Sequence, residues 1–138
     1  MPNRAPIESE EYRKMISGEE FFLIFTPTLK NRYFSLDPTL VEGRLKAKRL
    51  CRTLNDTIGD PENLGAAVLT KVRSELLDSL FGNCDRTAVE VEPPFWCDYG
   101  FNISLGKGFY CNFNCCILGI SNSMSIANAR LCKSHYWR

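Results

Sequence analysis

The chain has 138 residues, 44% of them hydrophobic and 24% charged, and its net charge at pH 7 is +1. This length and composition predict one folded domain, with or without a helical extension. The near-neutral charge is not typical of a protein that binds nucleic acid or an anionic membrane surface.

The sequence predicts a cytoplasmic protein. The apolar run at residues 21–25 is much shorter than the about 20 residues that span a bilayer. Residues 1–4 lack the apolar core of a secretory leader. The seven cysteines are an odd number, which a secreted disulfide scaffold does not favour. We therefore expect reduced thiols.

The N-terminal part predicts a short helix followed by an irregular segment. Ser9 is suited to cap a helix that runs to Ile16, and Gly18 is suited to end it. Residues 22–33 begin apolar, are interrupted by Pro27 and end basic. They lack the apolar stripe of a helix, so we expect no helix there.

Two amphipathic helices are predicted next. Asp37-Pro38 and Asp60-Pro61 are typical helix starts, with Asp as the N-cap and Pro in the first turn. The apolar face of the first helix carries Leu40, Gly43, Ala47, Leu50 and Leu54. The apolar face of the second helix carries Leu69, Val72, Leu76 and Leu80, and Gly82 is suited to end this helix. The short loop between them predicts an antiparallel hairpin that covers another part of the chain.

The second half of the chain repeats apolar residues every six positions. One row comprises Val91, Cys97, Ile103, Phe109 and Cys115, and a second comprises Leu105, Cys111 and Ile117. A period of six fits neither a helix nor a single half-buried strand. It is typical of a parallel β-solenoid, in which each hexapeptide forms one side of a three-sided coil.

The six-residue pattern starts near Val89 and stops at Ile120, because the next position of the row, 121, is a serine. Residues 89–120 therefore predict fewer than two turns of the coil, and residues 121–138 are interpreted as a divergent tail. A solenoid usually needs three or more stacked units and a cap at each end. We expect the helices to cap its N-terminal end, and its other edge to be open and marginally stable.

Several strings, in order, resemble the maltose and galactoside O-acetyltransferases, a family of hexapeptide-repeat acyltransferases. In the predicted solenoid they are EPPFWCDYGFNI at residues 92–103 and LGKGFYCNFNC at residues 105–115. Upstream they are KMISGE at residues 14–19, Leu36-Asp37-Pro38, Gly43-Arg44-Leu45 and Leu54-Asn55. Together they cover residues 10–21 and 34–118, and their joint occurrence is more specific than any single string.

The resemblance implies an α+β fold. A helical N-terminal domain at residues 9–82 would cap the first, incomplete coils of a left-handed parallel β-helix at residues 89–120. It also implies a homotrimer with active sites between neighbouring subunits, acetyl-CoA as the donor and a sugar hydroxyl as the acceptor. In such chemistry a histidine is the general base, and hydrogen-bond donors stabilise the oxyanion.

Five positions match places where the family lines the acceptor site: Asp37, Arg44, Asp98, Tyr110 and Asn112. Each also has a purely structural explanation. Asp37 is an N-cap, Arg44 could belong to a solvated helix face, and Asp98 could shape a corner of the coil. Asn112 could bind backbone inside a turn, and Tyr110 alternates away from the Phe109 row toward the surface.

The chain departs from the family pattern in two places. Residues 22–33 interrupt a stretch that is continuous in the family, as either a surface loop or a retained intron would. The family continues for several more coils after Leu118, with the catalytic histidine and the acetyl-CoA groove. Here the only histidine is His135, whose surroundings do not resemble the family motif, so we assign no catalytic residue.

Other site classes are less well supported. Cys111, Cys115 and Cys116 lack the two C-x2-C-type pairs of a zinc site, so no metal site is expected. The basic helix around Arg44 is interpreted as a solvated face rather than a nucleic-acid surface. Two hypotheses remain. The chain is a C-terminally truncated sugar O-acetyltransferase, or it is a non-catalytic fragment or splice product that at most binds partner subunits.

Overall fold

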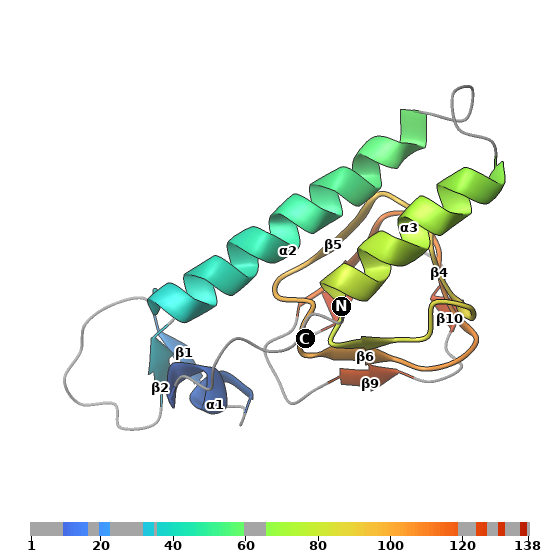
Figure 1. Cartoon of the computed structure of the whole chain (residues 1–138). Coiled ribbons are helices and arrows are strands. Elements are labelled where there is room, and N and C mark those ends of the chain that lie inside the picture. Colours follow the sequence, from blue (N-terminus) through green and yellow to red (C-terminus); the bar gives the residue numbers. More distant parts are fainter. Residues whose placement is uncertain are drawn as a thin grey trace.

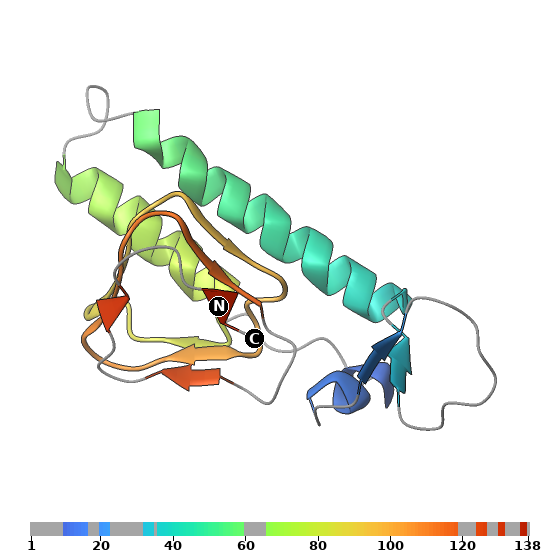
Figure 2. The ribbon, with the colours of Figure 1, turned by 180° about the vertical axis from the view of Figure 1, so that it is seen from behind.

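In the computed structural model of the chain, the described residues are 10–16, 20–22, 32–34, 36–59, 66–118, 124–126, 130–131 and 136–137. The helical elements are α1 (Glu10–Ile16), α2 (Pro38–Asp56), the 3-10 turn η1 (Thr57–Gly59) and α3 (Ala66–Leu80). They precede a coil of short strands, over which α2 and α3 lie side by side (Figures 1 and 2).

The strands are two or three residues long. The first two are β1 (Glu20–Phe22) and β2 (Arg32–Phe34). Those of the coil are β3 (Asn83–Cys84), β4 (Val89–Val91), β5 (Phe95–Cys97), β6 (Ile103–Leu105), β7 (Phe109–Cys111), β8 (Cys115–Ile117), β9 (Met124–Ile126), β10 (Arg130–Leu131) and β11 (Tyr136–Trp137).

The predicted start of α2 is confirmed. Asp37 precedes the helix, and its carboxylate accepts hydrogen bonds from the backbone N–H of Thr39 (3.0 Å) and Leu40 (3.3 Å). Pro38 occupies the first turn, where its missing N–H costs nothing. The buried face agrees with the predicted stripe except that Cys51 is fully buried and Leu50 only partly.

The second predicted helix is confirmed from Ala66 to Leu80, and its proposed Asp60-Pro61 start lies outside the described residues. α3 runs antiparallel to α2, as the hairpin prediction requires (Figure 1). α1 covers the predicted Glu10–Ile16 segment, whereas Ser9 and Gly18 lie outside the described residues.

The six-residue pattern corresponds to a three-sided parallel coil. Its strands form three sheets with the orders β3-β6-β9, β10-β7-β4 and β11-β8-β5, and every pairing is parallel. All members of the two predicted rows in these strands are buried. The residue between two buried ones in β4 to β8 is exposed or half-buried, as expected for a strand with one face in the core.

The predicted ends of the coil are wrong. Its first side is β3, before the expected start at Val89, and β9, β10 and β11 add a third layer beyond Ile120. The step from Cys115 to Met124 is nine residues rather than six, so the sequence pattern loses its frame there. The residues that the sequence assigned to a divergent tail thus include three strands in register with β6, β7 and β8.

The expected insert at residues 22–33 is bordered by paired strands. β1 and β2 are parallel, and Glu20 pairs with Arg32 and Phe22 with Phe34. Residues 23–31 lie outside the described residues.

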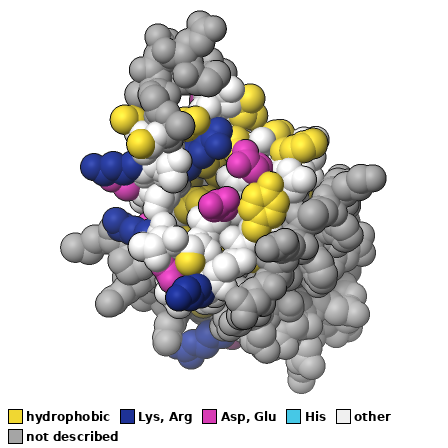
Figure 3. All heavy atoms as spheres, turned by 90° about the vertical axis from the view of Figure 1, so that its right-hand side faces the viewer, with side chains coloured by type: hydrophobic (Ala, Val, Ile, Leu, Met, Phe, Trp, Pro, Cys, Tyr) yellow, Lys and Arg dark blue, Asp and Glu magenta, His cyan; other side chains and the backbone are white. Residues whose placement is uncertain are grey.

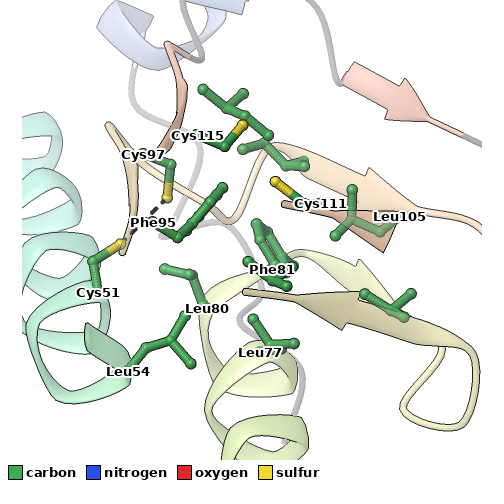
Figure 4. Packing of buried hydrophobic residues seen from close by; sticks show 14 of the residues in the cluster. Cys51, Leu54, Leu77, Leu80, Phe81, Phe95, Cys97, Leu105, Cys111 and Cys115 are labelled. Atoms are coloured by element: carbon green, nitrogen blue, oxygen red, sulfur yellow. Dashed lines mark hydrogen bonds between the residues drawn. The ribbon is translucent and has the colours of Figure 1, made fainter. Parts of the chain in front are cut away.

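The helices and the coil share one hydrophobic core. Leu54 of α2 and Leu77, Leu80 and Phe81 at the end of α3 join the inward residues of the coil in a single buried cluster (Figure 4). The rings of Phe81 and Phe95 meet edge to face, with centroids 5.8 Å apart. None of the described helices is long and apolar enough to cross a membrane.

Two glycines let α3 end directly on the coil. A Cβ on Gly82 would lie 2.0 Å from the carbonyl oxygen of Phe101, and the Gly82 N–H donates to the Ile103 carbonyl at 3.0 Å. Gly100 has φ +72°, and a Cβ there would lie 2.4 Å from the Leu80 carbonyl oxygen. Only glycine tolerates such close backbone contact and, at Gly100, this backbone conformation.

Asn55 completes the hydrogen bonding of an edge strand. β5 pairs with β8 on one side and faces α2 on the other. The Asn55 side chain accepts from the Phe95 N–H (2.8 Å) and donates to the Phe95 carbonyl (3.1 Å). This amide takes the place of a neighbouring strand, which an exposed sheet edge would otherwise seek.

We predict that Asn55→Ala lowers the free energy of unfolding by about 2 kcal/mol, because the Phe95 N–H and carbonyl both lose their partner at a covered edge. Urea denaturation followed by circular dichroism measures the change. Thr53→Ala is the control, since this exposed side chain on the same helix donates to the carbonyl of Arg49 and does not contact β5. Equal stabilities of the two variants would contradict the role given to Asn55.

Candidate functional site

Three polar side chains gather where α2 contacts β5. Arg44 Nη1 donates a hydrogen bond to the hydroxyl of Tyr99 at 2.7 Å, and its guanidinium carbon lies 5.6 Å from the centroid of the same ring. Asp98, just before Tyr99, lies close enough to Arg44 and Lys48 for both cations to act on its pKa. Of the predicted site residues, the structure therefore brings Arg44 and Asp98 together.

Burial and positive charge oppose each other at this cluster. Burial raises the pKa of Asp98, and the cations of Arg44 and Lys48 partly offset the increase. Burial likewise raises the pKa of Tyr99, against the hydrogen bond from Arg44. The cluster is a half-buried acid held beside a positioned guanidinium, which suits it to accept a hydrogen bond from a hydroxyl.

A small apolar cluster holds these groups in place. Leu40, Tyr99 and Phe101 are buried together, and Tyr12 of α1 packs on them. The rings of Tyr99 and Phe101 are 5.5 Å apart, and those of Tyr12 and Phe101 are 5.4 Å apart. This packing fixes the phenol that receives the hydrogen bond of Arg44.

Asp37 lies at the N-terminus of α2, two helical turns before Arg44. Its Oδ1 caps the helix through Thr39 and Leu40, so the structural explanation offered by the sequence is correct. A second role in ligand binding would have to use the remaining acceptor capacity of this half-buried carboxylate.

Tyr110 and Asn112 lie elsewhere on the coil. Tyr110 is the outward, half-buried residue of β7, and Asn112 follows it at the next corner. Asn112 Oδ1 accepts a hydrogen bond from the N–H of Phe113 at 2.9 Å, so its predicted turn-forming role is correct. Its side-chain N–H groups have donor capacity beyond this bond.

The five predicted residues therefore form two groups in one chain. β7 belongs to the sheet β10-β7-β4, whereas α2 packs on β5 of the sheet β11-β8-β5. Figures 1 and 2 place the N-terminal end of α2 and the strand β10 on opposite sides of the coil. Within a single chain, the five side chains therefore do not point toward one common site.

A hollow between α3 and β4 is a separate feature. Arg73, Arg86, Glu90 and Glu92 are among its lining residues, and none of the five predicted residues is. Figure 3 shows this side of the molecule, where basic and acidic side chains lie close together. Arg73 lies 3.6 Å from Glu92 and donates to Thr57 at 2.9 Å. This mixture of charges does not suit the pyrophosphate of a nucleotide.

The second arginine of the hollow is also engaged. Arg86 forms an ion pair with Asp78, and this hydrogen bond holds the pKa of Asp78 below its usual range. Among the described side chains, no group of three or more His, Cys, Asp or Glu is arranged to hold a metal ion. The six described cysteines are free thiols, and His135 lies outside the described residues.

Sequence reasoning selects Asp98 but misses Tyr99 and Lys48. Tyr99 directly follows Asp98, so alternation alone would point it away from the acid. The sequence feature that could have identified Tyr99 is the aromatic pair Tyr99 and Phe101. That these rings pack against Leu40 becomes evident only from the crossing of α2 over β5.

A family model agrees with the helical part of the chain. The maltose acetyltransferase hexapeptide capping motif matches residues 31–85. This segment contains β2, α2, α3 and the first strand of the coil.

Relatives and solved structures extend the similarity into the coil. A Schizosaccharomyces pombe protein named as an acetyltransferase is 41% identical over 128 residues, which are 88% of this chain and 56% of that protein. A hexapeptide-repeat acetyltransferase of Vibrio cholerae, complexed with acetyl-coenzyme A, is 25% identical with a TM-score of 0.58. The alignment covers 86% of this chain and 52% of that one.

A galactoside acetyltransferase in complex with coenzyme A is also similar. It is 28% identical with a TM-score of 0.52 and covers 69% of this chain and 42% of its own. The chain thus spans about half the length of the proteins that it matches.

We predict that Arg44→Met raises the pKa of Asp98 further, because the favourable charge of Arg44 is lost while burial remains. Titration of the Asp98 carboxyl by ¹³C NMR measures the effect. The control is Arg52→Met, which removes an exposed cation of the same helix that does not act on Asp98. An unchanged Asp98 titration in Arg44→Met would show that the two groups do not interact.

The raised pKa of Asp98 also predicts a pH dependence of stability. The folded chain holds this proton more tightly than the unfolded chain, so the contribution is fully present below the unfolded pKa. It is lost as the pH rises through the folded pKa. Asp98→Asn removes this titration, so its stability relative to wild type should increase between about pH 3 and pH 7. Parallel stability curves in chemical denaturation would refute this.

Proposed function

Because the chain belongs to the family of the maltose and galactoside O-acetyltransferases, we propose that it transfers acetyl groups from acetyl-CoA to a hydroxyl of a maltose- or galactoside-like sugar. One observation carries the proposal: a maltose acetyltransferase capping motif at residues 31–85 leads directly into a three-sided parallel coil. The ligands of the solved relatives, coenzyme A and acetyl-coenzyme A, support the choice of donor.

The fold proposed for this function is a left-handed β-helix capped by α2 and α3. The shared core of Leu54, Leu77, Leu80 and Phe81 with the coil supports the capping role. A cap is needed because the first layer would otherwise expose its backbone edge and its apolar interior. The free thiols of the six described cysteines agree with a cytoplasmic location, which we also propose.

We propose that Asp37, Arg44, Asp98, Tyr110 and Asn112 bind the sugar acceptor. The carboxylates of Asp37 and Asp98 would accept hydrogen bonds from sugar hydroxyls. Arg44, Tyr110 and Asn112 would donate to sugar oxygens. In this proposal the five side chains position the acceptor, and the general base comes from outside the described residues.

The opposite placement of the two groups supports a site between subunits. Arg44 and Asp98 of one chain would meet Tyr110 and Asn112 of a neighbouring chain, as in the homotrimer that the family resemblance implies. A closed symmetric oligomer forms every such site identically, because each chain contributes one group to each of its two neighbours.

The hollow beside α3 does not suit acetyl-CoA. The hollow beside α3 carries Glu90 and Glu92 as well as Arg73 and Arg86, and its arginines are already paired with acids. When bound, the donor would supply the thioester that is attacked by the sugar hydroxyl.

A second candidate is kept because the chain spans only about half the length of its relatives. In this alternative the polypeptide is a truncated, non-catalytic fragment or splice product that at most binds partner subunits. Transfer of radiolabelled acetyl from acetyl-CoA to maltose or a galactoside by the 138-residue chain alone would exclude this alternative. Absence of transfer, with association of the chain into an oligomer, would favour it.

We predict complementation between variants if the site lies between subunits. In a preparation that transfers acetyl, Arg44→Met and Asn112→Ala should each strongly reduce turnover. In an oligomer of one variant, every site lacks one acceptor-binding side chain. Mixed oligomers should recover about a quarter of wild-type activity, since some sites then take both intact groups from different chains. Acetyl transfer to the sugar by coexpressed variants is the measurement.

The control for this experiment is Lys107→Ala, at an exposed position of the coil outside the five residues. It should neither lower turnover nor change the complementation. No recovery in mixed oligomers, with both single variants inactive, would place all five residues in one chain's site and contradict the proposed arrangement.

A further inference from the structure

Two buried thiols meet where α2 packs on the coil. The sulfur atoms of Cys51 in α2 and Cys97 in β5 lie 3.9 Å apart and share a hydrogen bond (Figure 4). Cys51 is 0% exposed and Cys97 is 5% exposed. A disulfide needs a sulfur–sulfur distance of about 2.05 Å, so the pair requires only a small approach of the helix to the strand.

This pair differs from the other close thiols in the described part of the chain. Cys111 and Cys115 lie close enough to act on each other's pKa, but they are only four residues apart, across one corner of the coil. Their strands are held by ladder hydrogen bonds to the layers on both sides. Cys51 and Cys97 instead join a helix to an edge strand and are 46 residues apart, so a bond between them would close a long loop.

We propose that Cys51 and Cys97 form an oxidative modification site, in which a hydroperoxide converts the two thiols to a disulfide that links α2 to β5. The Cys51 sulfur attacks one peroxide oxygen and breaks the O–O bond, giving a sulfenic acid and releasing water or an alcohol. The Cys97 sulfur then attacks the Cys51 sulfur. The S–S bond forms, the S–O bond breaks, and the Cys97 proton leaves with the hydroxyl as water.

The surroundings support this order of events. The hydrogen bond shared with Cys97 lowers the pKa of Cys51, whereas the same contact and burial raise the pKa of Cys97. Cys51 is thus the better nucleophile for the first step.

The consequence of the bond is a covalent tie between the helical cap and the first layer of the coil. Cys97 directly precedes Asp98, and Cys51 lies two helical turns after Arg44. Oxidation would therefore fix the contact that holds the Arg44–Tyr99 hydrogen bond. It would also stabilise the fold by constraining the unfolded chain.

Peptide mapping of the folded, full-length chain tests the proposal. The reduced protein is treated with hydrogen peroxide, its remaining thiols are alkylated, and it is digested with trypsin without reduction. Cys51 lies in the tryptic peptide 50–52 and Cys97 in the peptide 87–107, and neither peptide contains another cysteine. We expect these two peptides to be recovered as one disulfide-linked species that dithiothreitol separates.

Thermal unfolding provides a second measurement on the same samples. The oxidised chain should melt on the order of 5–10 °C higher than the reduced chain. Cys51→Ala and Cys97→Ala should each abolish both the linked species and the increase. Cys111→Ala is the matched control, because it truncates an equally buried thiol of the same core without touching the pair.

Three results would overturn the proposal. The first is recovery of peptides 50–52 and 87–107 in singly alkylated form from the oxidised wild-type chain. The second is the same distribution of linked peptides when the chain is oxidised in guanidinium, since folding would then not direct the bond. The third is an unchanged melting temperature in a chain whose linkage is complete. The wild-type map decides the question even if an alanine variant does not fold.

Discussion

The structure depends on how a parallel coil begins. The first layer of such a coil has no preceding layer, so one backbone edge and one end of the apolar interior must be covered by something else. In the fold proposed above, α2 and α3 supply both covers. Leu77, Leu80 and Phe81 fill the open end of the core, and Asn55 gives the β5 edge the two hydrogen bonds that a strand would have made. Gly82 and Gly100 allow the backbone of α3 to meet the coil without a spacer.

The same contact shapes the candidate site. α2 crosses β5 because its apolar face is needed in the core, and this crossing carries Arg44 over the ring of Tyr99. Asp98 is then left half-buried beside two cations, which is why its pKa reflects both desolvation and charge. A stabilising helix–strand contact and a polar cluster suited to bind hydroxyls are therefore one structural feature. A change that weakens the packing of α2 on β5 would therefore alter the surroundings of Asp98 more than those of the distant sheets.

The sequence could predict what depends on local spacing. The Asp37-Pro38 start requires only the chemistry of a helix N-terminus, and the six-residue rows directly report which side chains face the interior. The third layer was missed because the corner between β8 and β9 changes length, and a fixed period cannot follow such a change. Tyr99 and Asn55 were missed for a different reason. Their partners are 55 and 40 residues away, and only the packed structure brings them together.

The position of Tyr110 and Asn112 leads to a constraint on assembly. They lie on the sheet that contains β7, whereas Arg44 and Asp98 lie where α2 meets the sheet that contains β5. A coil is stiff across its layers, because each strand is paired in parallel with a strand of the adjacent layer. No local movement can bring these faces together. If both groups bind one sugar, a second copy of the chain must present its β7 face to the α2 cluster of the first. The helix–coil contact then sets the geometry between chains as well as within one, since α2 carries Arg44 to the edge at which a neighbour would arrive.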